Sequence, residues 1–217
     1  MNITVIGSGN MGSGLVKQLT RAGHRVLVTG RDAAKAEALA RRYGTRAVKP
    51  AEAAASDVII VATGYADTVT ALKALGGLEG KVVVDITNPL TADYMGLTIG
   101  HTTSAAEEIA RAVPGARVVK AFNTVFAQVL DEGARLGGQP VPVFVAGDDP
   151  GAKSAVAGVA HSMGFDVIDA GALKNARYLE PMAGLNIYLG YGAKLGTSIA
   201  PAWLRKERGA AMERVAA

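Results

Sequence analysis

The sequence has no cysteine and only three histidines among its 217 residues. Without cysteine the chain can form no disulfide, no thiolate metal site and no thiol nucleophile. The histidines, His24, His101 and His161, are far apart in the sequence, and we expect no bound metal. His24 precedes a predicted strand and His161 lies in a predicted helix, so both are interpreted as structural. Only His101, in a predicted loop, is a candidate for contact with a substrate.

Several catalytic patterns are also absent. The sequence contains no G-x-S-x-G, no H-E-x-x-H and no C-x-x-C, and no Tyr-x-x-x-Lys pair on a predicted helix beyond the fourth strand. A reaction that turns an alcohol into a ketone needs a proton donor or acceptor at the substrate oxygen, and no side chain stands out for this role. A hydride transfer to a flavin-like ring needs less from the protein, because the ring takes up the charge itself.

Charge of one sign is not concentrated anywhere in the chain. The formal net charge is +4, the basic residues are scattered and aromatic residues make up 5% of the sequence, so nothing supports binding to nucleic acid. The mild positive excess suits a small anionic ligand equally well. The first residues lack the charged-then-apolar order of a signal peptide, and glycines interrupt the apolar region after residue 172, so we expect no membrane span. These features predict a soluble cytoplasmic protein.

What is present begins at residue 3, with the stretch ITVIGSGNMGSGLVKQL. An apolar, β-branched run is followed by the pattern G-x-G-x-x-G at Gly7, Gly9 and Gly12, and then by apolar residues at helical spacing. In this context Gly7 permits a sharp turn, Gly9 lets a ligand approach the backbone, and Gly12 lets the helix pack on the strand. The helix N-terminus would face a phosphate with unpaired N–H groups. The pattern predicts a dinucleotide site; the alternative is a glycine-rich turn without a ligand.

The end of the second predicted strand distinguishes NADP from NAD. An NAD site usually has an acidic residue there, about 20 residues beyond the glycines, to bind the ribose 2′-hydroxyl. Here the strand ends at Thr29 and Gly30 and is followed by Arg31, whose planar guanidinium suits a phosphate and can stack on adenine. Asp32 is expected to cap the next helix. Lys35 could reach the same phosphate and Thr29 could add a hydroxyl, so the sequence favours NADP; an ordinary solvated helix start is the alternative.

Strand-like and helix-like stretches alternate through most of the chain. This alternation is typical of an α/β fold with a doubly wound, mostly parallel sheet. Ser104 and Glu107 have the spacing of a capping box at one helix start. We expect a dinucleotide-binding domain over residues 1–171 and a small helical lobe over 172–217, which would cover the sheet or contact a second subunit. The predicted strands are 3–6, 25–29, 57–63, 81–87, 117–122, 141–147 and 166–170.

In a doubly wound sheet the ligand lies outside the carboxyl ends of the strands, so the residues that follow each strand are the candidates. The strand 57–63 ends in small residues that would let a cofactor pass, and Asp67 beyond them is interpreted as a helix-start residue. The amide of Asn88 suits the nicotinamide carboxamide, and Pro89 stiffens its loop. Each could instead be a turn residue that satisfies its own backbone. The remaining candidates at these strand ends are Ala62, Thr63, Gly64, Ala121, Phe122 and Asn123.

These candidates include no obvious acid or base. Asn88 and Asn123 are the nearest to a catalytic role, and their amides can donate and accept hydrogen bonds without carrying charge. We therefore expect no catalytic residue in the strict sense. Catalysis would rest on positioning, with two flat rings stacked so that the reacting atoms meet.

Six stretches of the sequence resemble one known family. They are IGSGNMG, VTGRDAAKAEA, DITNPL, VVKAFNT, DAGALKNARYLEPM and LNIYLGYGAKLGTSI, and they span nearly the whole chain. Together they resemble the F420-dependent NADP reductases, and the cytosolic reductase domain of six-transmembrane ferric reductases is similar too, especially at KAFNT. The resemblance implies a Rossmann domain with a short C-terminal helical lobe, usually as a homodimer. It also implies a pyrophosphate site at Ser8, Gly9, Asn10 and Met11 and a 2′-phosphate site at Thr29, Gly30, Arg31 and Lys35.

We therefore expect an oxidoreductase that moves hydride between NADP(H) and a deazaflavin such as coenzyme F420, or a flavin. Two alternatives stay open: an NADPH-dependent flavin or ferric reductase, and a non-catalytic NADP(H)-binding sensor. Lys174 and Arg177 follow the last predicted strand, and we expect them on the ligand side as cations for the phosphate-bearing tail of the acceptor; a solvated helix start is the alternative. The apolar segment MAGLNIYLGYGAKLG is expected at the interface of a homodimer.

Overall fold

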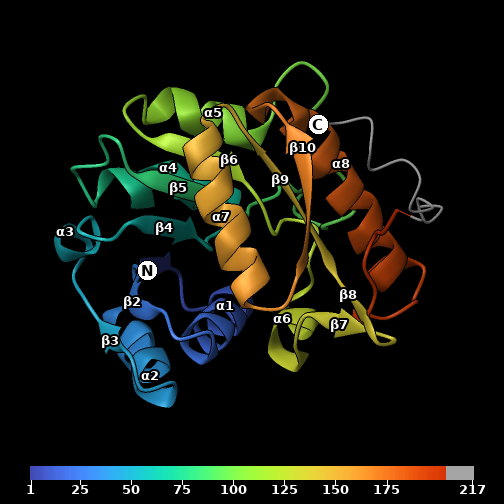
Figure 1. The fold of residues 1–217 in the computed structure, drawn as a ribbon. Coiled ribbons are helices and arrows are strands. Elements are labelled where there is room, and N and C mark those ends of the chain that lie inside the picture. Colours follow the sequence, from blue (N-terminus) through green and yellow to red (C-terminus); the bar gives the residue numbers. More distant parts are fainter. Residues whose placement is uncertain (204–217) are drawn as a thin grey trace, which may run out of the picture.

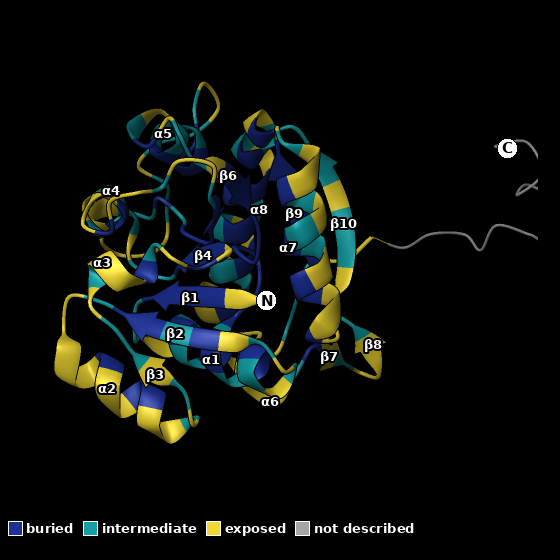
Figure 2. Ribbon diagram, turned by 60° about the vertical axis from the view of Figure 1, so that its left-hand side comes forward, coloured by how far each residue is buried: buried dark blue, intermediate teal, exposed yellow. Residues whose placement is uncertain are grey.

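The β-branched runs of the sequence form one eight-stranded sheet in the computed structural model, which describes residues 1–203 (Figure 1). The strands in the interior of the sheet are buried along almost their whole length, as expected where helices cover both faces (Figure 2). The order across the sheet is β10 (Asp166–Gly171), β9 (Pro142–Gly147), β6 (Arg117–Lys120), β5 (Val82–Asp85), β4 (Val58–Val61), β1 (Asn2–Ile6), β2 (Arg25–Thr29) and β3 (Arg46–Ala47).

Six strands are parallel, and the last two run the other way. β1 to β6 all share one direction, whereas β9 pairs antiparallel with β6, with Lys120 opposite Ala146. β10 then pairs parallel with β9. The doubly wound, mostly parallel sheet is therefore confirmed, and the seven predicted strands are all present. The carboxyl ends of β1, β2, β4, β5 and β6 meet at one edge of the sheet.

Helices cover both faces of the sheet. One hydrophobic core joins alternate strand residues to α1 (Asn10–Arg21), α2 (Ala33–Arg42), α6 (Ala127–Glu132) and α7 (Pro150–Ser162). A second core, on the opposite face, joins the intervening strand residues to α3 (Pro50–Ala53), α4 (Tyr65–Lys73) and α5 (Ala105–Ala112). Ser104 caps α5 as predicted, because its side chain accepts from the Glu107 N–H, and the Glu107 carboxylate returns the contact by accepting from the Ser104 hydroxyl.

The short elements are those that the sequence analysis did not predict. They are β3, α3, α6 and a small hairpin of β7 (Arg135–Leu136) and β8 (Gln139–Pro140). None exceeds six residues. Such lengths give less than two helical turns or a single pair of strand residues, so no periodicity can develop in the sequence.

Within the region predicted as a helical lobe, a 12-residue helix packs beside β9 and β10, and the division into two domains stays a prediction. A 3₁₀ turn, η1 (Leu173–Asn175), leads into α8 (Ala176–Ile187), and a π-helical turn, η2 (Tyr188–Gly192), follows it (Figure 1). Leu179 of α8 packs against Phe144 and Ala146 of β9. Residues 204–217 of the predicted lobe lie outside the described residues. Within residues 1–203, no helix combines the length and the apolar character that crossing a membrane requires.

Candidate functional site

The glycine-rich loop joins β1 to α1, and its three glycines have different roles. Gly7 has φ +117°, and a Cβ added there would lie 2.4 Å from the carbonyl oxygen of Ala62. A Cβ on Gly12 would lie 2.1 Å from the carbonyl oxygen of Gly7. Gly9 has no protein atom within 4 Å of such a Cβ. The fold itself therefore requires Gly7 and Gly12, whereas Gly9 leaves an open space over the backbone.

That open space lies at the N-terminus of α1. Gly9 is the N-cap residue, makes no side-chain cap, and is exposed together with Asn10. The first-turn N–H groups of a helix have no partner within the helix and carry a partial positive charge. Ser8, Gly9, Asn10 and Met11 thus present backbone donors toward solvent at the carboxyl edge of the sheet. The residues present fit the pyrophosphate of a dinucleotide.

Two exposed cations follow β2: Arg31 in the turn after the strand and Lys35 in the first turn of α2. The side chains of Arg31 and Lys35 are 89% and 75% exposed, so both are accessible to a phosphate. Asp32 caps α2 as predicted: it accepts from the Lys35 N–H at 3.0 Å, and this hydrogen bond holds its pKa below the usual range. The hydroxyl of Thr29 is buried and has no partner among the described residues. Its contact with the 2′-phosphate stays a prediction.

The floor between these two loops is made of small residues. A Cβ added to Gly30 would lie 3.8 Å from the Cα of Gly7, and Gly7 itself touches the backbone of Ala62 at the end of β4. Thr63 bonds to the hydroxyl of Thr68 in α4. Gly64 is exposed and is the N-cap of α4. The ends of β1, β2 and β4 therefore approach closely enough to form a continuous backbone surface for a nucleotide.

The ends of β5 and β6 are organised by two asparagines. The side-chain amide of Asn123 donates to Asn88 Oδ1 at 3.0 Å and to the carbonyl of Leu179 in α8 at 2.9 Å. Asn88 in turn donates to the backbone carbonyl of Asn123 at 2.9 Å. One acceptor, Asn123 Oδ1, is buried with no partner among the described residues. The predicted pair is brought together, and both amides are fixed by contacts inside the protein.

The segment before Asn123 is buried. Ala121 and Phe122 are at most 1% exposed and belong to the hydrophobic core, so their side chains do not face an open pocket. Phe122 also has φ +58°, in the left-handed region that bulky residues avoid. Only the backbone of this turn can border a nicotinamide. The expectation that Ala121 and Phe122 line the nicotinamide pocket therefore stays a prediction for their backbone atoms.

A buried charge cluster lies directly behind the asparagines, and the sequence analysis missed it. The ammonium of Lys120 donates to Asp85 at 2.8 Å, to Glu180 at 2.8 Å and to the Thr87 carbonyl at 2.6 Å. All three charged side chains are at most 1% exposed. The sequence did carry a signal, because Asp85 and Lys120 end two neighbouring apolar strands with opposite charges. Glu180 lies too far along the chain to be recognised as the third member.

Glu180 links this cluster to two helices. It belongs to α8 and accepts from the N–H groups of Ala105 and Ala106, in the first turn of α5. Burial raises the pKa of Glu180, and the nearby Lys120 charge and the α5 N–H donors oppose that rise. A single carboxylate therefore holds β6, α5 and α8 together next to the asparagines.

Lys174 and Arg177 were expected on the ligand side of the last strand, but that reasoning is wrong. The prediction assumed that the last strand runs parallel to the others. In the structure β10 runs antiparallel to β6, and α8 then returns toward the carboxyl edge of the sheet. Arg177 makes a two-bond ion pair with Glu107, at 2.7 and 2.9 Å. The two cations do line a hollow of about 580 Å³ together with His101, between α8 and the loop that precedes α5.

Comparison with known proteins decides the family. A family model described as "NADP oxidoreductase coenzyme F420-dependent" matches residues 2–89. The chain is 32% identical over 210 residues to the F420-dependent NADP reductase of Methanothermobacter thermautotrophicus, which covers 87% of this chain and 89% of that protein. The chain belongs to the F420-dependent NADP reductase family. It is therefore an NADP-dependent oxidoreductase, and the resemblance found in the sequence is confirmed.

One solved structure and one further curated protein extend the comparison. A crystal structure from Arthrobacter sp. FB24, provisionally described as an F420-dependent NADP reductase, matches with a TM-score of 0.81 and 33% identity over 90% of this chain and 96% of that one. The metalloreductase STEAP3 of Rattus norvegicus is 31% identical over 179 residues, which is 82% of this chain. The chain spans only 35% of that relative, whereas it spans nearly all of the archaeal and bacterial ones.

Proposed function

We propose that this reductase transfers hydride between NADPH and a deazaflavin, coenzyme F420, or a flavin. The observation that carries the proposal is the state of the asparagine pair. Asn88 and Asn123 bond to each other, and Asn123 also donates to the Leu179 carbonyl of α8, which makes a rigid and uncharged wall at the ends of β5 and β6. Such a wall can hold a flat ring and supplies no acid or base.

The buried charges behind the two asparagines support the same proposed function. Lys120, Asp85 and Glu180 are paired with each other and excluded from solvent, so they fix the wall and do not exchange protons with a ligand directly. When bound, NADPH supplies the hydride from its nicotinamide. The residues of this chain hold the pyrophosphate at Ser8 to Met11 and the 2′-phosphate at Arg31 and Lys35. A ring that takes up the hydride charge itself is the acceptor that needs no further side chain.

The acceptor is tested by turnover with a panel of oxidised compounds. Purified protein and NADPH are mixed in separate reactions with coenzyme F420, FMN, FAD or a ferric chelate, and the absorbance of NADPH and of each acceptor is followed. We expect the highest kcat/KM with F420. A preference for FMN, FAD or iron would favour a flavin or ferric reductase. NADPH binding without turnover of any acceptor would favour a sensor.

We also propose that the anionic tail of the acceptor lies in the hollow lined by His101, Lys174 and Arg177. Three basic side chains face this space, and Lys174 has no acidic partner among residues 1–203. Lys174→Ala should raise the KM for F420 and leave unchanged the KM for NADPH and for a deazaflavin without its tail. Lys73→Ala, an equal loss of charge at the end of α4, should change none of the three. An unchanged KM for F420 would contradict the assignment.

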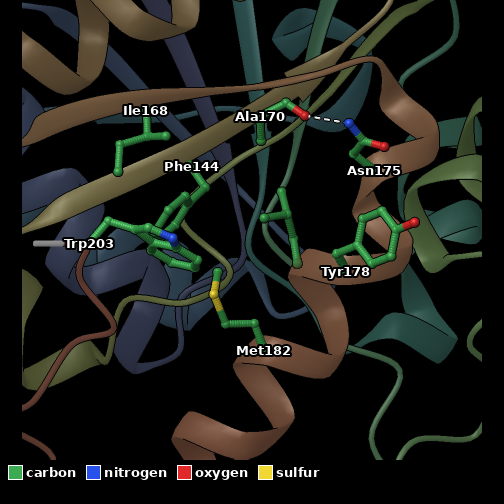
Figure 3. A pocket seen from close by; sticks show the side chains of 8 residues that line it. Phe144, Ile168, Ala170, Asn175, Tyr178, Met182 and Trp203 are labelled. Atoms are coloured by element: carbon green, nitrogen blue, oxygen red, sulfur yellow. Dashed lines mark hydrogen bonds between the residues drawn. The ribbon is translucent and has the colours of Figure 1, made fainter. Parts of the chain in front are cut away.

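We propose in addition that the protein is a homodimer with α8 at the interface. Five large apolar residues on α8, η2 and the segment that follows are more than half exposed: Tyr178, Leu185, Tyr188, Tyr191 and Leu195. Beside them, Trp203 packs edge-to-face on Phe144 at 5.3 Å and borders an apolar hollow of about 270 Å³ (Figure 3). Sedimentation at micromolar concentration should give a dimer, and Leu185→Asp should give a monomer. A wild-type monomer would contradict this proposal.

A further inference from the structure

We infer that Asp67 is a specificity-determining residue that holds Arg31 when no nucleotide is bound and competes with the 2′-phosphate for it. The inference rests on the proposed 2′-phosphate site and adds a residue that lies outside the glycine loop and the β2 tip. In the sequence, Asp67 had only the role of a helix-start residue. The structure brings it, at the start of α4, within 3.6 Å of Arg31 after β2.

The ion pair joins residues that follow the two strands on either side of β1. Arg31 follows β2 and Asp67 lies in the first turn of α4, which follows β4. β2 and β4 are the two neighbours of β1 in the sheet, so the glycine loop lies between the paired residues. Arg31 Nη1 is 3.6 Å from Asp67 Oδ2, and the two side chains are 89% and 60% exposed. A dinucleotide that runs from the glycine loop toward the β2 tip must pass this pair.

Asp67 differs from the other carboxylate near the site. Asp32 also pairs with a phosphate-site cation, Lys35, at 3.6 Å, but it caps α2 and has a structural reason to be there. The side chain of Asp67 has no hydrogen bond to the backbone or to another side chain among residues 1–203, and Arg31 is its sole ionic partner in that range. Besides its favourable place in the first turn of α4, the side chain of Asp67 therefore has Arg31 as its one charged contact among the described residues.

The competition follows from the chemistry of the guanidinium. Its planar fork binds a carboxylate or a phosphate in the same two-bond geometry. A phosphate monoester carries a charge of about −2 near neutral pH, so it binds the fork more strongly than one carboxylate does. NADPH must therefore break the Arg31–Asp67 pair, and NADH has no 2′-phosphate that requires this. Asp67 consequently lowers the affinity for NADPH and leaves the affinity for NADH unchanged.

The test compares Asp67→Asn with the wild type by calorimetry, using NADPH and NADH. Because exposed ion pairs are weak, we expect the Kd for NADPH to fall by about two- to five-fold. The Kd for NADH should not change. Asp169→Asn is the matched control: it removes the same charge and an ion pair with Lys153, at the opposite edge of the sheet. The control should alter neither constant.

A double-mutant cycle with Arg31→Ala separates competition from simple repulsion. If Asp67 acts by holding Arg31, Asp67→Asn should give no gain in NADPH affinity in the Arg31→Ala background. An equal gain in both backgrounds, an unchanged Kd, or weaker NADPH binding by Asp67→Asn would each overturn the role of Asp67. A wild type that binds NADPH and NADH equally would instead contradict the 2′-phosphate site itself.

Discussion

The two halves of the carboxyl edge are built in different ways. The half at β1, β2 and β4 is a surface of backbone and glycine, with exposed cations beside it. The half at β5, β6 and α8 is a set of buried polar side chains that bond to each other across distant parts of the chain. The nucleotide half is open and local in sequence. The other half, where we propose that the acceptor ring lies and which we call the acceptor half, is closed and depends on long-range contacts.

This difference predicts different consequences of substitution. In the nucleotide half the ligand groups are solvent-exposed, so a change there should affect binding and leave the stability of the fold almost unaltered. In the acceptor half the same side chains hold three elements together, so a change there should destabilise the protein. The family relationship shows that the nucleotide is NADP(H), and the acceptor has to be determined by experiment. Four substitutions test the contrast.

The largest effect is expected from Gly9→Val in the nucleotide half. A valine side chain would fill the space over the α1 amides and prevent contact with the pyrophosphate. We expect no detectable binding of NADPH by calorimetry, with a loss of about 1 kcal/mol or less in the free energy of unfolding. Gly158→Val is the matched control, since Gly158 is exposed on α7 and also has open space around it. Retained NADPH binding by Gly9→Val would contradict the proposed cradle.

Lys120→Met tests the acceptor half. It leaves the buried carboxylates of Asp85 and Glu180 without a counter-charge, and removal of one partner from a buried ion pair costs about 3–5 kcal/mol. We expect a loss of this size in the free energy of unfolding by urea. Lys153→Met, which breaks a pair with the largely exposed Asp169, should cost about 1 kcal/mol or less. Equal losses in the free energy of unfolding for the two variants would show that the buried ion pairs of Lys120 contribute no more to stability than an exposed pair does.

Arg31→Ala tests the nucleotide half by removing one cation of the proposed 2′-phosphate site. Loss of a charge-assisted hydrogen bond should weaken NADPH binding by about 1.5–3 kcal/mol and leave NADH binding unchanged. The free energy of unfolding should not change, because the side chain is exposed. Calorimetry with both nucleotides measures the difference. An equal loss toward NADPH and NADH would mean that Arg31 only stacks on adenine or supports the loop.

The smallest effect is expected from Glu107→Gln, on the α5–α8 contact. The hydrogen bonds from Arg177 hold the pKa of Glu107 below its usual range, so the folded state binds its proton less readily than the unfolded state. The stabilisation is present above the ordinary carboxyl pKa and is lost as the pH falls through the lowered one. Glutamine keeps the capping-box geometry. We expect the variant to lose about 1 kcal/mol at pH 7, and the difference should vanish in acid. A difference that persists in acid would show that the effect is not ionic.

Sequence analysis predicted all seven of the longer strands, but only some of the contacts that the side chains at their ends make. The long apolar runs fixed the sheet, because burial on both faces demands them. The direction of β10 was not predictable, since a strand that pairs antiparallel looks the same in sequence as one that pairs parallel. The argument that placed Lys174 and Arg177 on the ligand side failed for that reason, and their contact with the acceptor stays a proposal. Burial of Phe122 with a positive φ also has no signature in the residues around it.

The sequence by itself predicted the glycine loop and the cations after β2, and with them the preference for NADP. These parts lie between Gly7 and Lys35, and the spacing of glycines, strand and helix start is a local property of the backbone, whereas the end of β4 reaches the glycine loop only through the sheet. Only the tertiary structure decided the acceptor half. Lys120 is 35 residues from Asp85 and 60 from Glu180, and Asn88 is 35 from Asn123. Contacts over such separations depend on which strands are neighbours and on the path of α8, and these are consequences of packing that no short pattern encodes.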